Sequence, residues 1–326
     1  MLTIPIQVSG DVWNNRSDVK QLLDQTVSGQ QIMLDLCSEG PSLRRLGVTE
    51  LVDQYNLNVS ITRWSNGVES VPYQRVFCNA NSHFFPMSHH YWVDETPNKA
   101  SAEFRFAMFQ GRGCPSRNRI LYDAYHVWPG KFLLSKMHSR HAKSWIDTSK
   151  NTSISLESLS EWFTDVDAAQ QWFENCPINS IDNRVIQDQY QIPEVSSGEM
   201  ARSLLLNHYR RFNVELVCET YTRGKCFFPT EKTIRPMVGN RLLLVYGPID
   251  YLRNLQNAGF RTFDTLWDES YDQYEGPIRW KKMSELIDNL ASMPAPQWQN
   301  IVEKSLEITQ HNRNKIRQII RDLKGI

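Results

Sequence analysis

Short apolar runs alternate with stretches of helical spacing along the first hundred residues. Gln31 to Leu36 (QIMLDL) and Val59 to Thr62 are apolar runs that predict strands, and Val76 to Cys78 predicts a third. Between the first two, apolar residues recur at helical spacing from Leu43 to Val52. This β-α-β alternation predicts a parallel sheet with helices on its faces.

The second half of the chain repeats this pattern. Strands are predicted at Phe104 to Phe109, Lys131 to Lys136, Val214 to Cys218, Leu242 to Val245 and, briefly, Thr262 to Phe263. Helices are predicted at Arg119 to Tyr125, near Leu156 to Phe173, and at Ser203 to Arg211, Glu231 to Val238, Ile249 to Ala258, Pro277 to Met293 and Pro296 to Leu323. Thr230 is a candidate N-cap, and Gly259 suits a helix end. The fold class is therefore α/β.

The length of 326 residues suits two domains. We expect a first domain over residues 1–101, a second over residues 102–295, and a final helix over residues 296–326 that packs back across the domains. Two doubly wound halves facing each other leave a cleft, and ligands of such sheets bind beyond the carboxyl ends of the strands. The site should lie in the loops after the strands that end FRFAMF, VELVC and LLLV.

Charge and composition narrow the functional classes. The 36 basic and 36 acidic side chains balance, which gives no support for tight non-specific nucleic-acid binding. No apolar run approaches the roughly 20 residues that span a bilayer, and no signal peptide is evident. The six cysteines are scattered without a C-x-x-C pair, which is typical of reduced thiols in a cytoplasmic protein and not of a zinc site.

The densest polar constellation joins Glu219 to the segment Thr230, Glu231, Lys232 and Arg235. A helix N-terminus favours phosphate, a lysine beside it adds a point charge, and a glutamate can accept hydrogen bonds from ribose hydroxyls. The same residues also suit a capping box with a solvated Glu-Lys pair, so both interpretations stay open.

The run VELVCET…FFPTEKTIRPMVGNRLLLVYGP resembles the C-terminal motif of the family 10 fucosyltransferases. The run from Gly247 to Asp272 is similar to a group of glycosyltransferase-like proteins from bacteria and their phages. Together these likenesses cover Val214 to Asp272. They imply a GT-B-like fold, with two Rossmann-like domains facing a central cleft and C-terminal helices.

The resemblance also implies residue roles and a donor. Glu231 and Lys232 would contact the ribose and phosphates of a nucleoside-diphosphate sugar, with a GDP-sugar the first choice and a UDP-sugar the second. Glu219 precedes the gap in the motif. An arginine on the diphosphate would be Arg117, with Arg112 as the second choice. Three departures from the fucosyltransferase pattern, at Thr220, Phe228 and Pro236, leave the sugar and the base open.

The implied reaction moves a sugar to a hydroxyl acceptor by displacement at the anomeric carbon, with inversion. The cations and helix N–H groups would stabilise the leaving diphosphate without a metal, and no Asp-x-Asp is placed to bind one. A carboxylate of the N-terminal half would act as the base. Glu39 is the candidate, with Glu95 and Asp94 as alternatives, although Glu39 equally suits a helix N-terminus.

Three functional hypotheses follow. In the first, the chain is a glycosyltransferase whose acceptor is a glycan, a lipid-linked sugar or a small molecule. In the second, the acceptor is a modified base of phage DNA, which the basic stretch from Gln310 to Arg321 would favour. In the third, the chain is a non-catalytic binding protein on the same fold.

Overall fold

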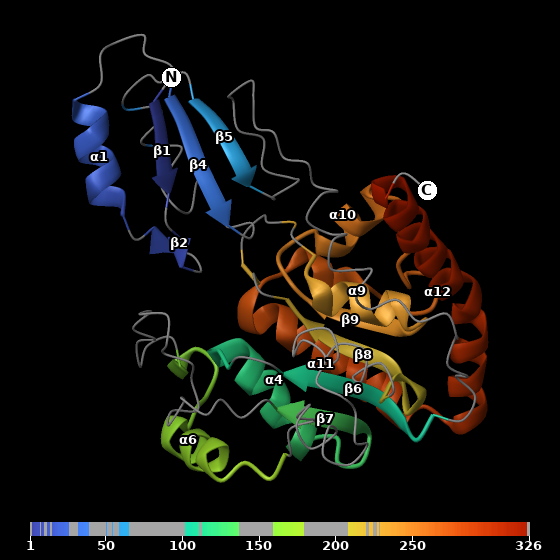
Figure 1. Cartoon of the computed structure of the whole chain (residues 1–326). Coiled ribbons are helices and arrows are strands. Elements are labelled where there is room, and N and C mark those ends of the chain that lie inside the picture. The colour runs from blue at the N-terminus through green and yellow to red at the C-terminus, as the bar shows by residue number, and fades with distance from the viewer. Residues whose placement is uncertain are drawn as a thin grey trace, which may run out of the picture. The chain divides into compact units, whose positions relative to one another are not determined.

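The computed structural model describes residues 2–6, 8–9, 12–13, 15–25, 32–38, 50, 54, 59–64, 102–110, 113–136, 159–178, 208–219, 222–223, 227 and 229–324. The chain divides into two compact units (Figure 1). The first contains Met1–His83 and Arg223–Phe228, and the second contains Phe84–Thr222 and Pro229–Ile326. The second unit includes the final helix, and the predicted domain limits at residues 101 and 295 stay predictions.

The first unit contains a three-stranded parallel sheet. Its order is β1 (Leu2–Ile6), β4 (Ile32–Ser38) and β5 (Val59–Trp64), with a small antiparallel pair formed by β2 (Val8–Ser9) and β3 (Val12–Trp13). Helix α1 (Arg16–Asp24) buries Val19 and Leu23, which are one turn apart. Strands β4 and β5 confirm two predicted strands, whereas β1 and α1 were not predicted.

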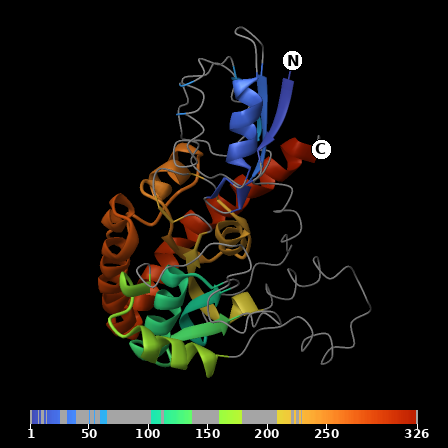
Figure 2. The same cartoon turned by 90° about the vertical axis from the view of Figure 1, so that its left-hand side faces the viewer.

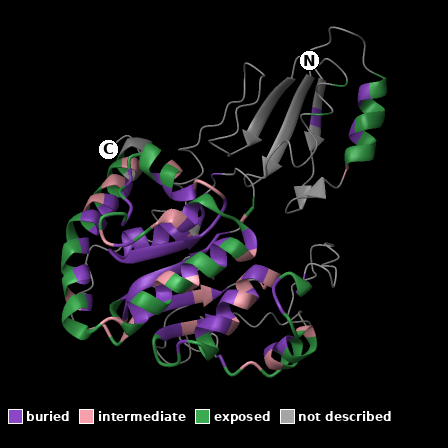
Figure 3. Cartoon of the chain, turned by 180° about the vertical axis from the view of Figure 1, so that it is seen from behind, coloured by how far each residue is buried: buried purple, intermediate pink, exposed green. Residues whose placement is uncertain are grey.

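The second unit is built on four parallel strands. Their order is β7 (Phe132–Lys136), β6 (Phe104–Gln110), β8 (Phe212–Cys218) and β9 (Leu242–Tyr246). Every residue of β8 and β9 is buried, as expected for a parallel sheet covered on both faces (Figure 3). The structure confirms the predicted α/β class, and this sheet is compatible with a Rossmann-like fold.

Helices cover both faces of this sheet. Helix α4 (Pro115–His126) crosses from β6 to β7, and α9 (Glu231–Val238) crosses from β8 to β9 in the opposite direction. Because such crossovers are right-handed, the two helices lie on opposite faces. Helix α11 (Gly276–Ser292) packs against α4, and α12 (Ala295–Lys324) packs against α9 (Figure 1, Figure 2).

Side-chain hydrogen bonds attach the last two helices to the unit. The indole of Trp280 donates to Asp123 of α4 over 2.7 Å, and the indole of Trp298 donates to Asn213 of β8 over 3.1 Å. The other elements of the unit that the structure describes in full are α6 (Val166–Glu174), α10 (Tyr251–Asn257) and two short 3₁₀ helices, η2 (His208–Arg210) and η3 (Ser270–Gln273).

Most predicted elements of this unit are confirmed, with two corrections. The predicted strand at Thr262 and Phe263 is a loop, because side chains bind its backbone in place of a neighbouring strand. The amide of Phe263 donates to Glu269, and Asn312 of α12 bonds both the amide and the carbonyl of Arg261. The helix predicted near 156–173 is also wrong in extent, because residues 161–165 interrupt it. Residues 159–160 are helical, and α6 begins after Asp165, whose carboxylate caps the amide of Ala168.

Several predicted elements are only partly covered. The strand at 76–78 lies outside the described residues. The structure describes only Glu50, which is helical, of the helix predicted from 43 to 52, and only residues 208–211, which include η2, of the helix at 203–211.

Candidate functional site

The strand order of the second unit places a topological switch point between β6 and β8. The chain leaves β6 toward β7 and leaves β8 toward β9, so α4 and α9 begin at the carboxyl ends of two neighbouring strands. In open parallel sheets this is the position where ligands bind. The N-terminal ends of the two helices therefore lie at the same edge of the sheet, one from each face.

The start of α4 is suited to an anion. Its N-cap, Cys114, makes no capping hydrogen bond with its side chain, and the first turn contains no acidic residue. Pro115 occupies the first turn, where its missing N–H costs no hydrogen bond. The same turn carries Arg117, so the partial positive charge of the helix end is increased and not neutralised.

Arg117 also connects this helix to the neighbouring strand. Its guanidinium donates to the backbone oxygen of Glu219, directly after β8, over 2.7 Å. This bond spans the switch point. It places the predicted diphosphate-binding arginine beside the loop that leads to α9.

The Glu219 carboxylate is buried and accepts four hydrogen bonds. Its donors are the Thr230 amide (3.0 Å), the Thr230 hydroxyl (2.6 Å), the Thr233 hydroxyl (2.6 Å) and the Tyr251 hydroxyl (2.8 Å). These bonds fix the first turn of α9 and the first turn of α10 to the end of β8. Glu219 thus positions α9 in this geometry, and the ribose contact that the resemblance implies for it stays a prediction.

Lys232 lies in the first turn of α9, close to the N-cap residue Thr230. The Thr230 hydroxyl oxygen accepts from the Lys232 amide (3.3 Å), as the predicted cap should, and also lies 3.2 Å from the ammonium nitrogen. This arrangement holds the ammonium group at the beginning of the helix and not along its side.

Arg117 and Lys232 both lie close to the end of β8. Burial raises the pKa of the Cys218 thiol to about 12, while the positive charges of Arg117 and Lys232 act to lower this pKa. Both side chains are therefore near enough to Cys218 for their charges to act on it. Two helices that follow different strands thus bring one cation each to the same strand end.

Arg235, one turn further along α9, has a different environment. Its guanidinium donates to the Glu215 carboxylate over 2.9 Å, in the middle of β8, and lies 5.9 Å from the centre of the Phe109 ring. The Tyr209 hydroxyl donates to the other oxygen of Glu215. Burial raises the pKa of Glu215, and Arg235 and Tyr209 oppose this effect. Arg235 therefore ties α9 to the sheet core.

The remaining predicted site residues are not placed by the structure. Glu39, Glu95, its alternative Asp94, and Arg112 lie outside the described residues. The backbone of Glu231 begins α9, but its side chain also lies outside them. The structure thus brings together Arg117, Glu219, Thr230 and Lys232, and it separates Arg235 from their edge of the sheet.

Sequence reasoning missed the residues that support this edge. Thr233 and Tyr251 complete the donors around Glu219, and the buried amide of Gln110 at the end of β6 donates to Asn118 of α4 over 2.6 Å. Glu215 offered a signal, because a charged residue inside an otherwise apolar strand needs a partner when buried. An arginine on the following helix would have been the natural candidate.

No helix in the described part of the chain is long and apolar enough to cross a membrane. Nor do the described residues include three His, Cys, Asp or Glu side chains grouped so that they could hold a metal ion. The sequence matches no protein-family model and no curated protein.

Proposed function

We propose that the chain is a GT-B glycosyltransferase whose second unit binds the diphosphate of a sugar nucleotide at the switch point. The observation that carries this proposal is that α4 and α9 begin at adjacent strand ends, each with a cation in its first turn. Arg117 and Lys232 are those cations. The Thr-Glu-Lys segment that resembles the family 10 fucosyltransferases begins one of the two helices, which supports the same assignment.

The chemistry follows from the charge that develops on the leaving group. When the bond between the anomeric carbon and the diphosphate breaks, negative charge grows on the diphosphate oxygens. The fixed helix N–H groups, Arg117 and Lys232 stabilise the transition state, where this charge develops, more than they stabilise the bound donor. The difference lowers the barrier without a metal. A carboxylate of the first hundred residues, Glu39 or Glu95, takes the proton of the acceptor hydroxyl.

The donor is a GDP-sugar or, as the second choice, a UDP-sugar, and the acceptor is a hydroxyl of a glycan, a lipid-linked sugar or a small molecule in the cytoplasm. A DNA acceptor has weaker support. Within the basic stretch that favoured it, Arg313 and Ile316 are buried, so this part of α12 packs on its own unit.

A thermal-shift panel of nucleoside diphosphates and their sugars tests the donor class without knowledge of the acceptor. GDP or UDP should raise the melting temperature of the wild-type chain, and Lys232→Ala should abolish the shift. Lys281→Ala, which removes an exposed lysine of α11, is the matched control and should leave the shift unchanged. A wild-type chain that responds to none of these compounds would refute the proposal. Release of sugar from the donor distinguishes a transferase from a binding protein.

A further inference from the structure

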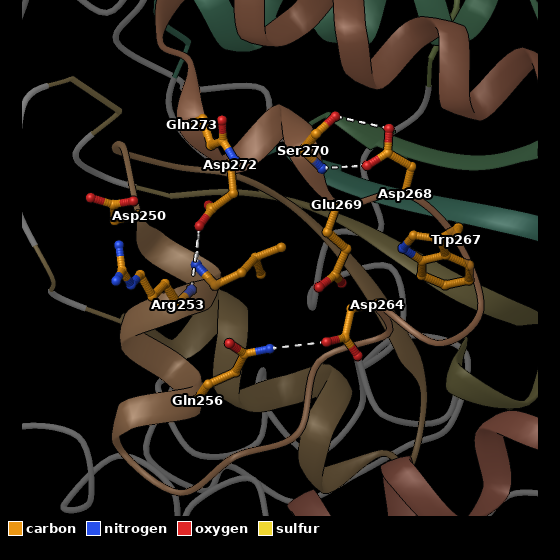
Figure 4. A pocket seen from close by; sticks show the side chains of 11 residues that line it. Asp250, Arg253, Gln256, Asp264, Trp267, Asp268, Glu269, Ser270, Asp272 and Gln273 are labelled. Atoms are coloured by element: carbon orange, nitrogen blue, oxygen red, sulfur yellow. Dashed lines mark hydrogen bonds between the residues drawn. The ribbon is translucent and has the colours of Figure 1, made fainter.

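A pocket lies along α10, and none of its lining residues belongs to the switch point. Its volume is about 590 Å³, within the usual range for small-molecule sites (Figure 4). One wall is formed by Arg253 and Gln256 of α10, and the other by residues 264–273. Tyr251 projects from the same helix in another direction, to Glu219. The two sites therefore share a helix but not a surface.

The lining of this pocket is strongly acidic. Five of its residues carry carboxylates, against a single cationic side chain, that of Arg253; the five are Asp250, Asp264, Asp268, Glu269 and Asp272.

Some of these carboxylates have structural partners. Asp272 accepts from the amides of Leu252 and Arg253 at the start of α10, and it pairs with the buried Arg279 over 2.8 Å. Asp268 accepts from the amide and hydroxyl of Ser270. Asp264 and Glu269 have fewer strong donors. A long contact of 3.5 Å from Gln256 reaches Asp264, and Glu269 accepts from the Phe263 amide and the Thr262 side chain. The pocket lining therefore has more hydrogen-bond acceptors than donors and more negative than positive charge.

An independent observation points to a ligand. The Trp267 side chain is only 7% exposed, and its indole N–H has no hydrogen-bond partner among the residues that the structure describes. Figure 4 shows this nitrogen on the side of the ring that faces Glu269. A buried donor without an acceptor is destabilising, and buried polar groups are almost always paired. An acceptor atom supplied by a ligand would satisfy it.

These features define the chemistry of the ligand. A metal ion does not fit, because no three acidic, histidine or cysteine side chains of the described chain are grouped closely enough to hold one. The carboxylates instead suit a larger organic cation that also carries an oxygen acceptor. We propose that this pocket binds a hydroxyl-bearing primary amine of monosaccharide size. Its ammonium group lies between Glu269 and Asp264, and its hydroxyl oxygen accepts from Trp267. This proposal does not depend on the proposed sugar transfer.

The pocket should bind such a ligand in a pH-dependent manner. Burial, helped by the charges of Asp264 and Asp272, raises the pKa of Glu269 to about 7, although hydrogen bonds from Thr262 and Phe263 act to lower it. Asp250, Asp268 and Arg253 also line the pocket, and Arg279 is paired with Asp272 behind it. An ammonium group favours the ionised form of Glu269, so binding should strengthen as the pH rises from 5 to 7, where the amine stays mostly protonated.

Isothermal titration with glucosamine at pH 7 tests the proposal, because its ammonium group adjoins hydroxyls. We expect the wild-type chain to bind glucosamine, and we expect Asp264→Asn and Glu269→Gln each to weaken this binding at least tenfold. Glucose, which lacks the positive charge, should not bind. Glu303→Gln removes an exposed carboxylate of α12 and should change nothing. Asp264 is exposed, so its variant should fold even if the Glu269 variant does not.

A spectroscopic measurement locates the ligand. In a ¹⁵N-labelled chain, glucosamine should shift the indole N–H signal that disappears in Trp267→Phe. Absence of glucosamine binding to the wild type, equal binding of glucose, affinity unchanged in Asp264→Asn, or an unmoved Trp267 signal would each overturn the proposal.

Discussion

The guanidinium of Arg117 donates to the backbone oxygen of Glu219 over 2.7 Å, and this bond joins the helix after β6 to the end of β8. The backbone of Glu219 thus receives the arginine of one helix, while its carboxylate holds the first turn of the next. One residue at the switch point fixes both helix ends. The position of any anion bound there should depend on this connection.

Replacement of Glu219 by alanine should be among the most destabilising single changes in the second unit. It leaves the buried donors of Thr230, Thr233 and Tyr251 without their acceptor. We expect a loss of about 3 kcal/mol or more in the free energy of unfolding, measured by urea denaturation. Glu303→Ala, on the exposed face of α12, should change it by no more than about 0.5 kcal/mol. A loss below about 1 kcal/mol for Glu219→Ala would show that the carboxylate does not hold α9.

Arg235→Met should also destabilise the chain, for a different reason. The substitution keeps the bulk of the side chain but leaves the buried Glu215 carboxylate without its cation. Loss of one partner of a buried pair costs about 3 to 5 kcal/mol, which urea denaturation can measure. The double variant Glu215→Gln with Arg235→Met should recover part of this loss, because no uncompensated charge remains. If the double variant loses as much free energy of unfolding as Glu215→Gln and Arg235→Met lose separately when their losses are added, the two side chains are not coupled.

Glu269 should make stability fall as the pH rises. Its pKa is about 7 in the folded chain against an ordinary value of 4.5, so the folded state binds the proton more tightly. Its favourable contribution is complete below pH 4.5 and is lost as the pH rises through 7. The difference amounts to about 3 kcal/mol at most, because partial exposure of the side chain reduces it.

Glu269→Gln isolates this effect. The variant should be more stable than the wild type at pH 8 and similar to it at pH 4.5, as measured by urea denaturation at both values. Equal stability differences at the two pH values would contradict the assignment of a raised pKa to Glu269.

The sequence was sufficient for the parts of the fold that depend on local pattern. The unbroken apolar runs of β8 and β9 predict buried parallel strands, and Thr230 before Glu231 predicts the start of α9. The same reasoning failed at Phe263, whose apolar side chain suggested a strand. Its backbone amide is satisfied by Glu269, six residues further on, and such a side-chain contact has no periodic signature.

The candidate site was predictable to a similar degree. Arg117 and Lys232 were identified through a resemblance, and the strand order then brought both to the same edge of the sheet. The role of Glu219 could not be read from its neighbours in the sequence, because Tyr251, one of its donors, lies 32 positions away. Contacts of this kind are decided by tertiary packing.

Isothermal titration of GDP into the wild-type chain and its variants tests the central claim most directly. The wild type should bind GDP, and Arg117→Ala and Lys232→Ala should each weaken the affinity by about 10- to 100-fold, because each removes one charge-assisted contact to phosphate. Lys281→Ala should bind as the wild type does. Titration with UDP covers the second choice of donor. A wild type that binds neither diphosphate, or variants of Arg117 and Lys232 that bind as tightly as the wild type, would contradict an anion site between α4 and α9.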